Sequence, residues 1–219
     1  RHDSNCDWGL VENLRLEMHN RDQHCKVIAP QWARHLLGPV YRKLSNGGSH
    51  SVTITPGGTV TVTSLEPTAL SASVKLSDIR QANLVLVRST VVEEPPISLA
   101  EYTCGGIRRQ ALFSHPPDQG VRMLHFFVQP SPGADVSLRT AVGLAHGSKS
   151  GGVRFAIWLN GNELWSKRVV PADGWVPVSV SLGKVTGDPV LLTLVTDSDG
   201  HNYYDWAVWA DPELTVQTP

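Results

Sequence analysis

The segment VRFAIWLNGNELWSKRVV, residues 153–170, contains the clearest local signal for the fold. Residues 153–160 and 163–170 both have the composition of β-strands, and Asn160-Gly161 lies between them. Asn-Gly is a strong signal for a two-residue hairpin turn, because such turns place both central residues at positive φ. The segment therefore predicts two antiparallel strands that are neighbours in one sheet.

The same strand pattern recurs on both sides of this hairpin. In VPVSVSL, residues 176–182, alternate residues from Val176 to Leu182 are apolar and fall on one face, and Pro177 and two serines fall on the other. Further strands are predicted across residues 121–128, 136–144, 190–196 and 204–210. Seven strands at intervals of about ten residues, with no helical pattern between them, favour an antiparallel β-sandwich or jelly roll.

The first part of the chain is less regular. Residues 50–65 contain two alternating runs around Pro56-Gly57-Gly58 and predict a hairpin, and residues 71–76 and 82–89 predict two more strands. The apolar residues of 10–18 fit neither the helical nor the strand period cleanly, so both structures remain open there, whereas residues 29–44 favour a short helix that Gly38-Pro39 interrupts. Pro95-Pro96 favours a boundary, so we expect a β-rich region of unknown type over 1–94 and a jelly-roll domain over 95–219.

Composition limits the class of protein. The chain has 219 residues and a formal net charge of -1, so nothing in its charge favours nucleic acid or an anionic membrane as a partner. No apolar run approaches the roughly 20 residues of a membrane-spanning helix. The chain begins RHDSN without a methionine, from which we expect a processed form or part of a longer protein. Cys6 and Cys25 could pair and leave Cys104, but three cysteines do not decide the compartment.

Motifs of common enzymes are missing from the sequence. It has no G-x-S-x-G nucleophile elbow, no phosphate-binding glycine loop and no zinc-type cysteine spacing. Ser114 and His115 are adjacent, and neighbours on a strand point to opposite faces, which argues against a catalytic pair. We therefore expect no enzyme, although a site within the first half remains an alternative.

The second half resembles the NPCBM-like carbohydrate-binding modules, which are jelly-roll domains attached to glycoside hydrolases and other bacterial carbohydrate-active proteins. Four segments support this resemblance in order: GGIRRQALFSHPP (105–117), TAVGLAHGSKSGGVRFAIWLNGNELW (140–165), DGWVPVSVSLGKVTGDPVLLTLVTD (173–197) and YYDWAVWADPEL (203–214). The resemblance spans about residues 97–216, and residues 1–96 match no family that we recognise. The loop after Gly143 is not acidic, which departs from the family pattern.

The resemblance implies a non-catalytic module that binds a glycan or polysaccharide, with calcium as a structural cofactor in some members. Sugar sites combine flat aromatic faces with a few polar groups. The candidate ligand-binding residues are His115, Asp118, Trp158, Tyr203, Tyr204 and Trp206. The candidate calcium ligands are Asp197, Asp199 and Asp205. The alternative role for Asp197 and Asp199 is to form turns, and for Asp205 to accept hydrogen bonds from backbone donors.

Residues 204–210 predict that the aromatic side chains divide between two faces. Asp205, Ala207 and Trp209 share one face of a strand, and Tyr204 and Trp206 share the other. We therefore expect one of these tryptophans to be buried and the other to lie nearer solvent.

A structural domain that docks onto an enzyme or glycosyltransferase domain of the same polypeptide is the alternative function. In that case the aromatic residues would belong to the core and to the interface. Secretion or display at the cell surface is the expected location for a glycan-binding module, unless the chain is part of an intracellular transferase.

Overall fold

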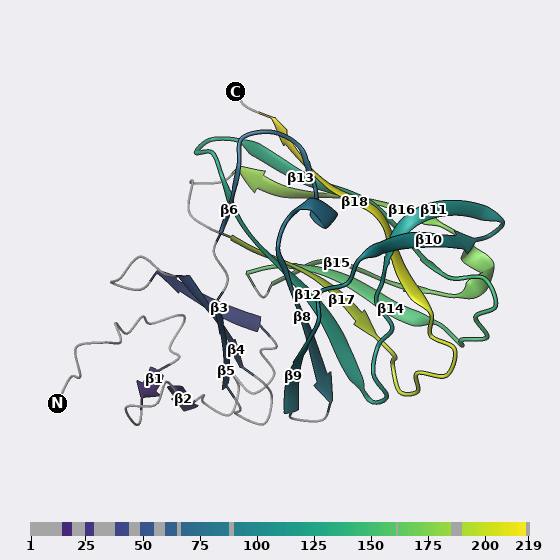
Figure 1. Cartoon of the computed structure of the whole chain (residues 1–219), viewed down its shortest axis with the longest axis horizontal. Helices are drawn as coiled ribbons and strands as arrows, with labels where there is room; N and C mark the ends of the chain where they lie inside the picture. The colour runs from purple at the N-terminus through teal and green to yellow at the C-terminus, as the bar shows by residue number, and fades with distance from the viewer. Residues whose placement is uncertain are drawn as a thin grey trace.

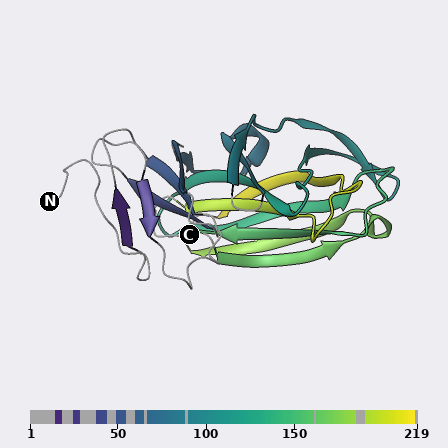
Figure 2. The same cartoon turned by 90° about the horizontal axis from the view of Figure 1, so that it is seen from below.

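The computed structural model describes residues 15–18, 25–28, 38–43, 49–54, 60–64, 67–87, 90–160, 162–184 and 190–217. Two β-sheets form a sandwich from Thr68 onward, and the strands β1 and β2 lie beyond one end of it (Figures 1 and 2). The predicted fold class, an antiparallel β-sandwich, is confirmed.

The first sheet, here the six-stranded sheet, contains the closing strand of the chain at its centre. Its order is β10 (Leu99–Cys104), β11 (Ile107–Phe113), β18 (Ala207–Gln217), β13 (Asp135–Leu144) and β16 (Val176–Lys184). The short β7 (Val74–Lys75) pairs with β18 as well. All of these neighbours are antiparallel.

The second sheet, here the seven-stranded sheet, contains the hairpin predicted from Asn160-Gly161. Its order is β15 (Asn162–Val169), β14 (Val153–Leu159), β17 (Val190–Asp197), β12 (Gly120–Pro130), β8 (Gln81–Val87) and β9 (Thr90–Glu94). β14 pairs antiparallel with β15, and Asn160 in the turn has φ of 50°, as this turn requires. The strands of this sheet pair antiparallel, except that the short β6 (Thr68–Leu70) runs parallel to β12.

The core lies between the two sheets and follows the alternation of their strands. Phe126 and Phe155 of the seven-stranded sheet and Trp209 of the six-stranded sheet are completely buried in it. Val178, Val180 and Leu182 point inward from β16, as the pattern of VPVSVSL predicts. Two short 3-10 helices, η2 (Leu76–Asp78) and η3 (Pro171–Asp173), complete the sandwich.

Strands on both sides of the expected boundary at residue 95 share the sheets of the sandwich. β8 pairs with β12 over Gln81–Val87, and Leu70, Leu76 and Ile79 belong to the main core cluster. The hydrogen-bonded sandwich therefore begins near residue 68, upstream of the expected boundary, because β8 extends the sheet beyond β12.

Most of residues 1–66 lie outside the described part of the chain. Within that part, β1 (Arg15–Met18) pairs with β2 (Cys25–Ile28), and β3 (Gly38–Lys43), β4 (Ser49–Ile54) and β5 (Val60–Ser64) form a second small sheet. The predicted hairpin over 50–65 is present as β4 and β5. The expected helix over 29–44 is wrong from Gly38 onward, where β3 pairs with β4, and residues 29–37 lie outside the described residues.

Candidate carbohydrate-binding site

Three loops meet at one end of the sandwich and form what we call the end-loop cluster. They are residues 114–119 after β11, residues 145–152 after β13 and residues 198–206 before β18. The Ser114 amide donates to the carbonyl of Ala207 at 2.8 Å, and the Ala145 amide donates to that of Trp206 at 2.9 Å. These backbone hydrogen bonds hold the three loops together, although they are far apart in the sequence (Figure 1).

Two tyrosine side chains of the 198–206 loop are exposed at the surface of the cluster. Tyr203 is 77% exposed and Tyr204 is 46% exposed. The rings of Tyr204 and Trp206 are 5.7 Å apart between centroids, and Nζ of Lys149 lies 5.5 Å from the centroid of Tyr204. The cluster thus presents flat apolar surfaces beside a charged hydrogen-bond donor, the combination that a sugar ring can use.

Trp206 is held in place by a glycine on the neighbouring loop. Gly147 has φ of 89°, and a Cβ at this position would lie 2.9 Å from Cζ3 of Trp206. Any other residue would therefore meet both an unfavourable backbone conformation and the indole ring. Glycine at position 147 lets Trp206 pack directly on the 145–152 loop.

Unusual backbone conformations gather in this cluster. Gln119, Asp199 and Tyr204 have positive φ, at 52°, 52° and 57°, and only two other non-glycine residues of the described chain share this property. A left-handed conformation is unfavourable for a bulky residue such as tyrosine, and such strain occurs often at functional sites. The hydrogen bond from the Trp206 amide to the Tyr204 carbonyl at 2.8 Å stabilises this turn.

Asp205 is buried at the base of the cluster, where the half-buried His115 contacts it. Nδ1 of His115 lies 2.7 Å from the carbonyl oxygen of Asp205, and the His115 ring stacks on Phe113. The Asp205 side chain is 1% exposed, and its Oδ2 has no hydrogen-bond partner among the described residues. Burial raises the pKa of Asp205 above its ordinary value, although Ser150, His115 and Arg168 act in the opposite direction.

Five of the six candidate ligand-binding residues lie in the end-loop cluster. Asp118 and Tyr203 are exposed at its surface, where Asp118 lies 3.7 Å from His201, and His115, Tyr204 and Trp206 lie next to them. Trp158 does not join them. It lies at the opposite end of β14 from the 145–152 loop, is 8% exposed and donates from Nε1 to Glu163 at 3.3 Å.

The expectation that one of Trp206 and Trp209 is buried and the other lies nearer solvent is confirmed. Trp209 is completely buried in the core, whereas Trp206 is only partly buried. The strand begins at Ala207 and not at Tyr204, because the turn around Tyr204 interrupts it.

The three candidate calcium ligands do not converge on one point. Asp199 pairs with Arg168, Asp197 accepts the Asp199 amide at 2.8 Å, and Asp205 is buried against His115. Within the described part of the chain, no group of three His, Cys, Asp or Glu side chains could hold a metal ion together. These carboxylates therefore do not fit a calcium site.

Several residues near the ligand candidates were absent from the sequence prediction. Lys149 and Gly147 belong to a glycine-rich loop without sequence periodicity, and their positions depend on contacts with residues 204–206. Arg109 lies in β11 and Trp175 lies between η3 and β16, so the two share no sequence motif.

Among the described residues, no helix is long and apolar enough to cross a membrane.

Comparison with known proteins agrees with the expected family. Residues 133–215 match the NPCBM/NEW2 domain, whereas no curated protein matches the chain. A similar solved structure is the tandem CBM51 modules of Sp3GH98, the family 98 glycoside hydrolase from Streptococcus pneumoniae SP3-BS71. It is 12% identical with a TM-score of 0.46, over 71% of this chain and 53% of that chain.

Two further structures come from Clostridium perfringens. CBM51 of GH95, in complex with methyl-galactose, is 13% identical with a TM-score of 0.45, over 65% of this chain and 99% of that one. The structure of CBM51-2 in complex with GlcNAc and INT domains of ZmpB is 14% identical with a TM-score of 0.41, over 82% of this chain and 38% of that chain. This chain thus covers about half of the Streptococcus structure and less than half of the ZmpB structure. From residue 133 to residue 215, the chain thus matches the NPCBM/NEW2 domain, in agreement with the sequence resemblance.

Proposed function

We propose that this chain is a non-catalytic carbohydrate-binding module, and that its end-loop cluster holds the sugar. The observation that supports this most strongly is the pair of exposed tyrosines, Tyr203 and Tyr204, beside Trp206 and under the ammonium group of Lys149. A pyranose ring would stack on an aromatic face, and Lys149 and Asp118 would bind its hydroxyl groups. The match to the NPCBM/NEW2 domain supports the same function.

The cellular context forms part of this proposal. The module would belong to a larger carbohydrate-active protein that acts outside the cell, where its neighbouring domain would modify the bound glycan. A role in docking onto that neighbouring domain is the alternative, and in that case the aromatic residues of the end-loop cluster would meet protein instead of sugar.

Glycan-array screening of the folded chain, followed by calorimetric titration of the best ligands, tests the proposal. Tyr203→Ala and Tyr204→Ala should each weaken binding by about ten-fold or more, equivalent to about 1.4 kcal/mol. Leu164→Ala is a matched control, because Leu164 is also an exposed apolar residue, 42% exposed, but lies on β15. Circular dichroism of each variant would show that the fold is retained.

The outcomes separate the functions. Blank arrays with a well-folded chain would contradict sugar binding and favour the docking role. Turnover of any glycoside by this chain would contradict both non-catalytic roles.

A further inference from the structure

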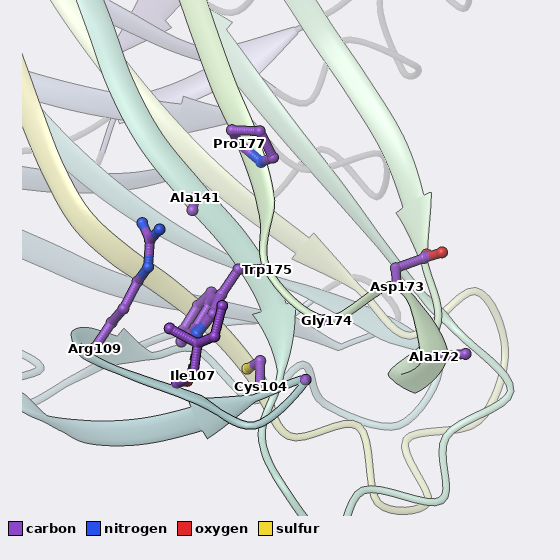
Figure 3. Close-up of a pocket in the computed structure, with 10 residues that line it drawn as sticks. Cys104, Ile107, Arg109, Ala141, Ala172, Asp173, Gly174, Trp175 and Pro177 are labelled. Carbon is purple, nitrogen blue, oxygen red and sulfur yellow. Dashed lines mark hydrogen bonds between the residues drawn. The ribbon is translucent and has the colours of Figure 1, made fainter.

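A hollow lies on the outer side of the six-stranded sheet, next to the turn between β10 and β11. We call it the Trp175 cavity. Its volume is about 470 Å³, and its lining includes Cys104, Ile107, Arg109, Asp173, Trp175 and Pro177 (Figure 3). This volume falls within the roughly 300–1,000 Å³ of small-molecule sites.

The indole ring of Trp175 is fixed before any ligand arrives. Its Nε1 donates to the carbonyl oxygen of Ile107 at 2.8 Å. A Cβ at Gly143 would lie 3.1 Å from Cε3 of Trp175 and 2.9 Å from Sγ of Cys104, so the glycine lets the ring approach the backbone of β13. A preorganised aromatic ring lowers the entropy cost of binding a flat ligand.

Arg109 places a positive charge at this ring. Its guanidinium carbon lies 5.8 Å from the centroid of Trp175. Within the described chain, Arg109 has no carboxylate at ion-pair distance, whereas its neighbour Arg108 pairs with Glu101 at 3.5 Å. The charge of Arg109 is therefore available to an anion.

The acidic residue in the lining does not neutralise Arg109. Oδ2 of Asp173 accepts the amide of Val170 at 2.9 Å. Figure 3 shows the Asp173 side chain on the other side of the cavity, pointing away from Arg109 and Trp175. The part of the cavity next to the indole ring therefore combines an apolar face with an unpaired cation.

We propose that the Trp175 cavity binds the carboxylate-bearing residue of an acidic glycan. The sugar ring packs on Trp175, and its carboxylate pairs with Arg109, whose planar guanidinium suits two parallel hydrogen bonds. This rests on the proposed function in taking a sugar as the ligand. Uronic acids and sialic acids share this chemistry.

The position of the cavity is consistent with one ligand that reaches both sites. Trp175 and Trp206 pack against the same cluster of small buried side chains on this face of the sheet, namely Cys104, Ala111, Ala141, Ala145, Val208 and Ala210. An oligosaccharide that crosses this cluster would contact the end-loop cluster at one side and the Trp175 cavity at the other.

Calorimetric titration of the full chain with two matched pairs of probes tests the proposal. The pairs are oligogalacturonides with their methyl-esterified forms, and sialyllactose with lactose. At least one acidic probe should bind about ten-fold or more tightly than its neutral counterpart, with a preference that falls as salt rises. It should also shift the NMR signal of the Trp175 indole N–H.

Two arginine variants locate the charge. Arg109→Gln should remove the preference for the acidic probe, and Arg108→Gln, the control on the same strand, should keep it. Equal binding of acidic and neutral probes, no binding of either acidic probe, or a preference that survives in Arg109→Gln would overturn the proposal. A preference lost in Lys149→Gln and kept in Arg109→Gln would assign the charge to the end-loop cluster, which would leave the proposed function standing.

Discussion

Phe155 of β14 and Trp209 of β18 meet across the sandwich, with ring centroids 5.2 Å apart and planes at 75° to each other. The edge-to-face contact joins the seven-stranded sheet to the six-stranded sheet, and both side chains are completely buried. Aromatic pairs prefer such an arrangement, which places the positive edge of one ring on the negative face of the other.

Removal of this contact should destabilise the whole sandwich. We expect Trp209→Ala to lower the free energy of unfolding by about 3–5 kcal/mol, because it leaves a large cavity between the sheets. Trp209→Phe should lower the free energy of unfolding much less, because phenylalanine keeps an aromatic ring in the core. This substitution also removes Nε1, which is buried without a hydrogen-bond partner in the described structure. Urea denaturation measures both, and equal losses in the two variants would contradict this explanation.

His125 should make the protein sensitive to acid. Its ring is completely buried next to Thr193, and burial lowers its pKa to about 3. An unfolded chain takes up this proton near pH 6.5, whereas the native state does so only near pH 3. The contribution of His125 is therefore complete above pH 6.5 and falls by about 1.4 kcal/mol per pH unit between these values.

Denaturation curves between pH 7 and pH 4 should reveal this slope. In His125→Gln the slope should be shallower by that amount, while the exposed His201→Asn should match the wild type. An unchanged slope in His125→Gln would show that other groups cause the acid sensitivity.

Asp205 should have the opposite dependence on pH. Because burial raises its pKa in the folded protein, the native state holds the proton more tightly than the unfolded chain does. Ionisation of Asp205 therefore removes stability as the pH rises through its folded pKa. We expect Asp205→Asn to be more stable than the wild type at pH 7, with the gain lost at low pH.

Urea denaturation at both pH values measures this effect. Asp135→Asn on the exposed side of β13 is the control and should have little effect at either pH. A variant at position 205 that is less stable than the wild type at pH 7 would contradict the expectation.

Gly147 offers a test of the end-loop cluster that leaves its aromatic residues intact. Gly147→Ala should place Cβ against Trp206 and weaken sugar binding, in addition to a loss of about 1–2 kcal/mol in stability from the left-handed backbone. Gly133→Ala is the matched control, because Gly133 also has positive φ, at 78°, but has open space around its Cβ position. Comparable sugar binding by the two alanine variants would show that the packing of Trp206 on Gly147 does not affect binding.

Truncation distinguishes the expected boundary at residue 95 from the limits of the sandwich. A fragment over 95–219 lacks β8, whose Leu84 and Leu86 are buried, and also lacks Leu76 of the core. We expect a fragment over 67–219 to unfold cooperatively and the shorter fragment to have no cooperative transition. Differential scanning calorimetry measures both, and equal stability would support independent folding from residue 95.

Local pattern was sufficient to identify most strands of the sandwich. The apolar alternation of residues 176–182 and the Asn160-Gly161 turn predicted β16 and the β14–β15 hairpin correctly, because both depend on neighbours in the sequence. β10 and β11 were not predicted as strands. β11 contains Arg108, Arg109 and Gln110 in succession, since much of this edge hairpin faces solvent and shows no clear alternation.

The candidate site was predictable only in part. That one of Trp206 and Trp209 is buried and the other lies nearer solvent followed from a period of two along the closing segment. The position of Trp158 outside the end-loop cluster could not be predicted, because its local pattern fits a ligand-binding strand equally well. Its burial depends on Leu84, Met123 and Val195 of three other strands.

By itself, the sequence determined the sheet class, the hairpin at Asn160-Gly161 and the match of residues 133–215 to the NPCBM/NEW2 domain, because periodicity, turn chemistry and ordered motifs are local properties of the chain. Only the tertiary structure decided which distant residues meet. It brought Lys149 to Tyr204, Gly147 to Trp206 and Arg109 to Trp175, and it separated the three aspartates once expected to share calcium. Such contacts arise from the pairing of β11, β13 and β18, which are far apart in the sequence, and no local pattern encodes that pairing.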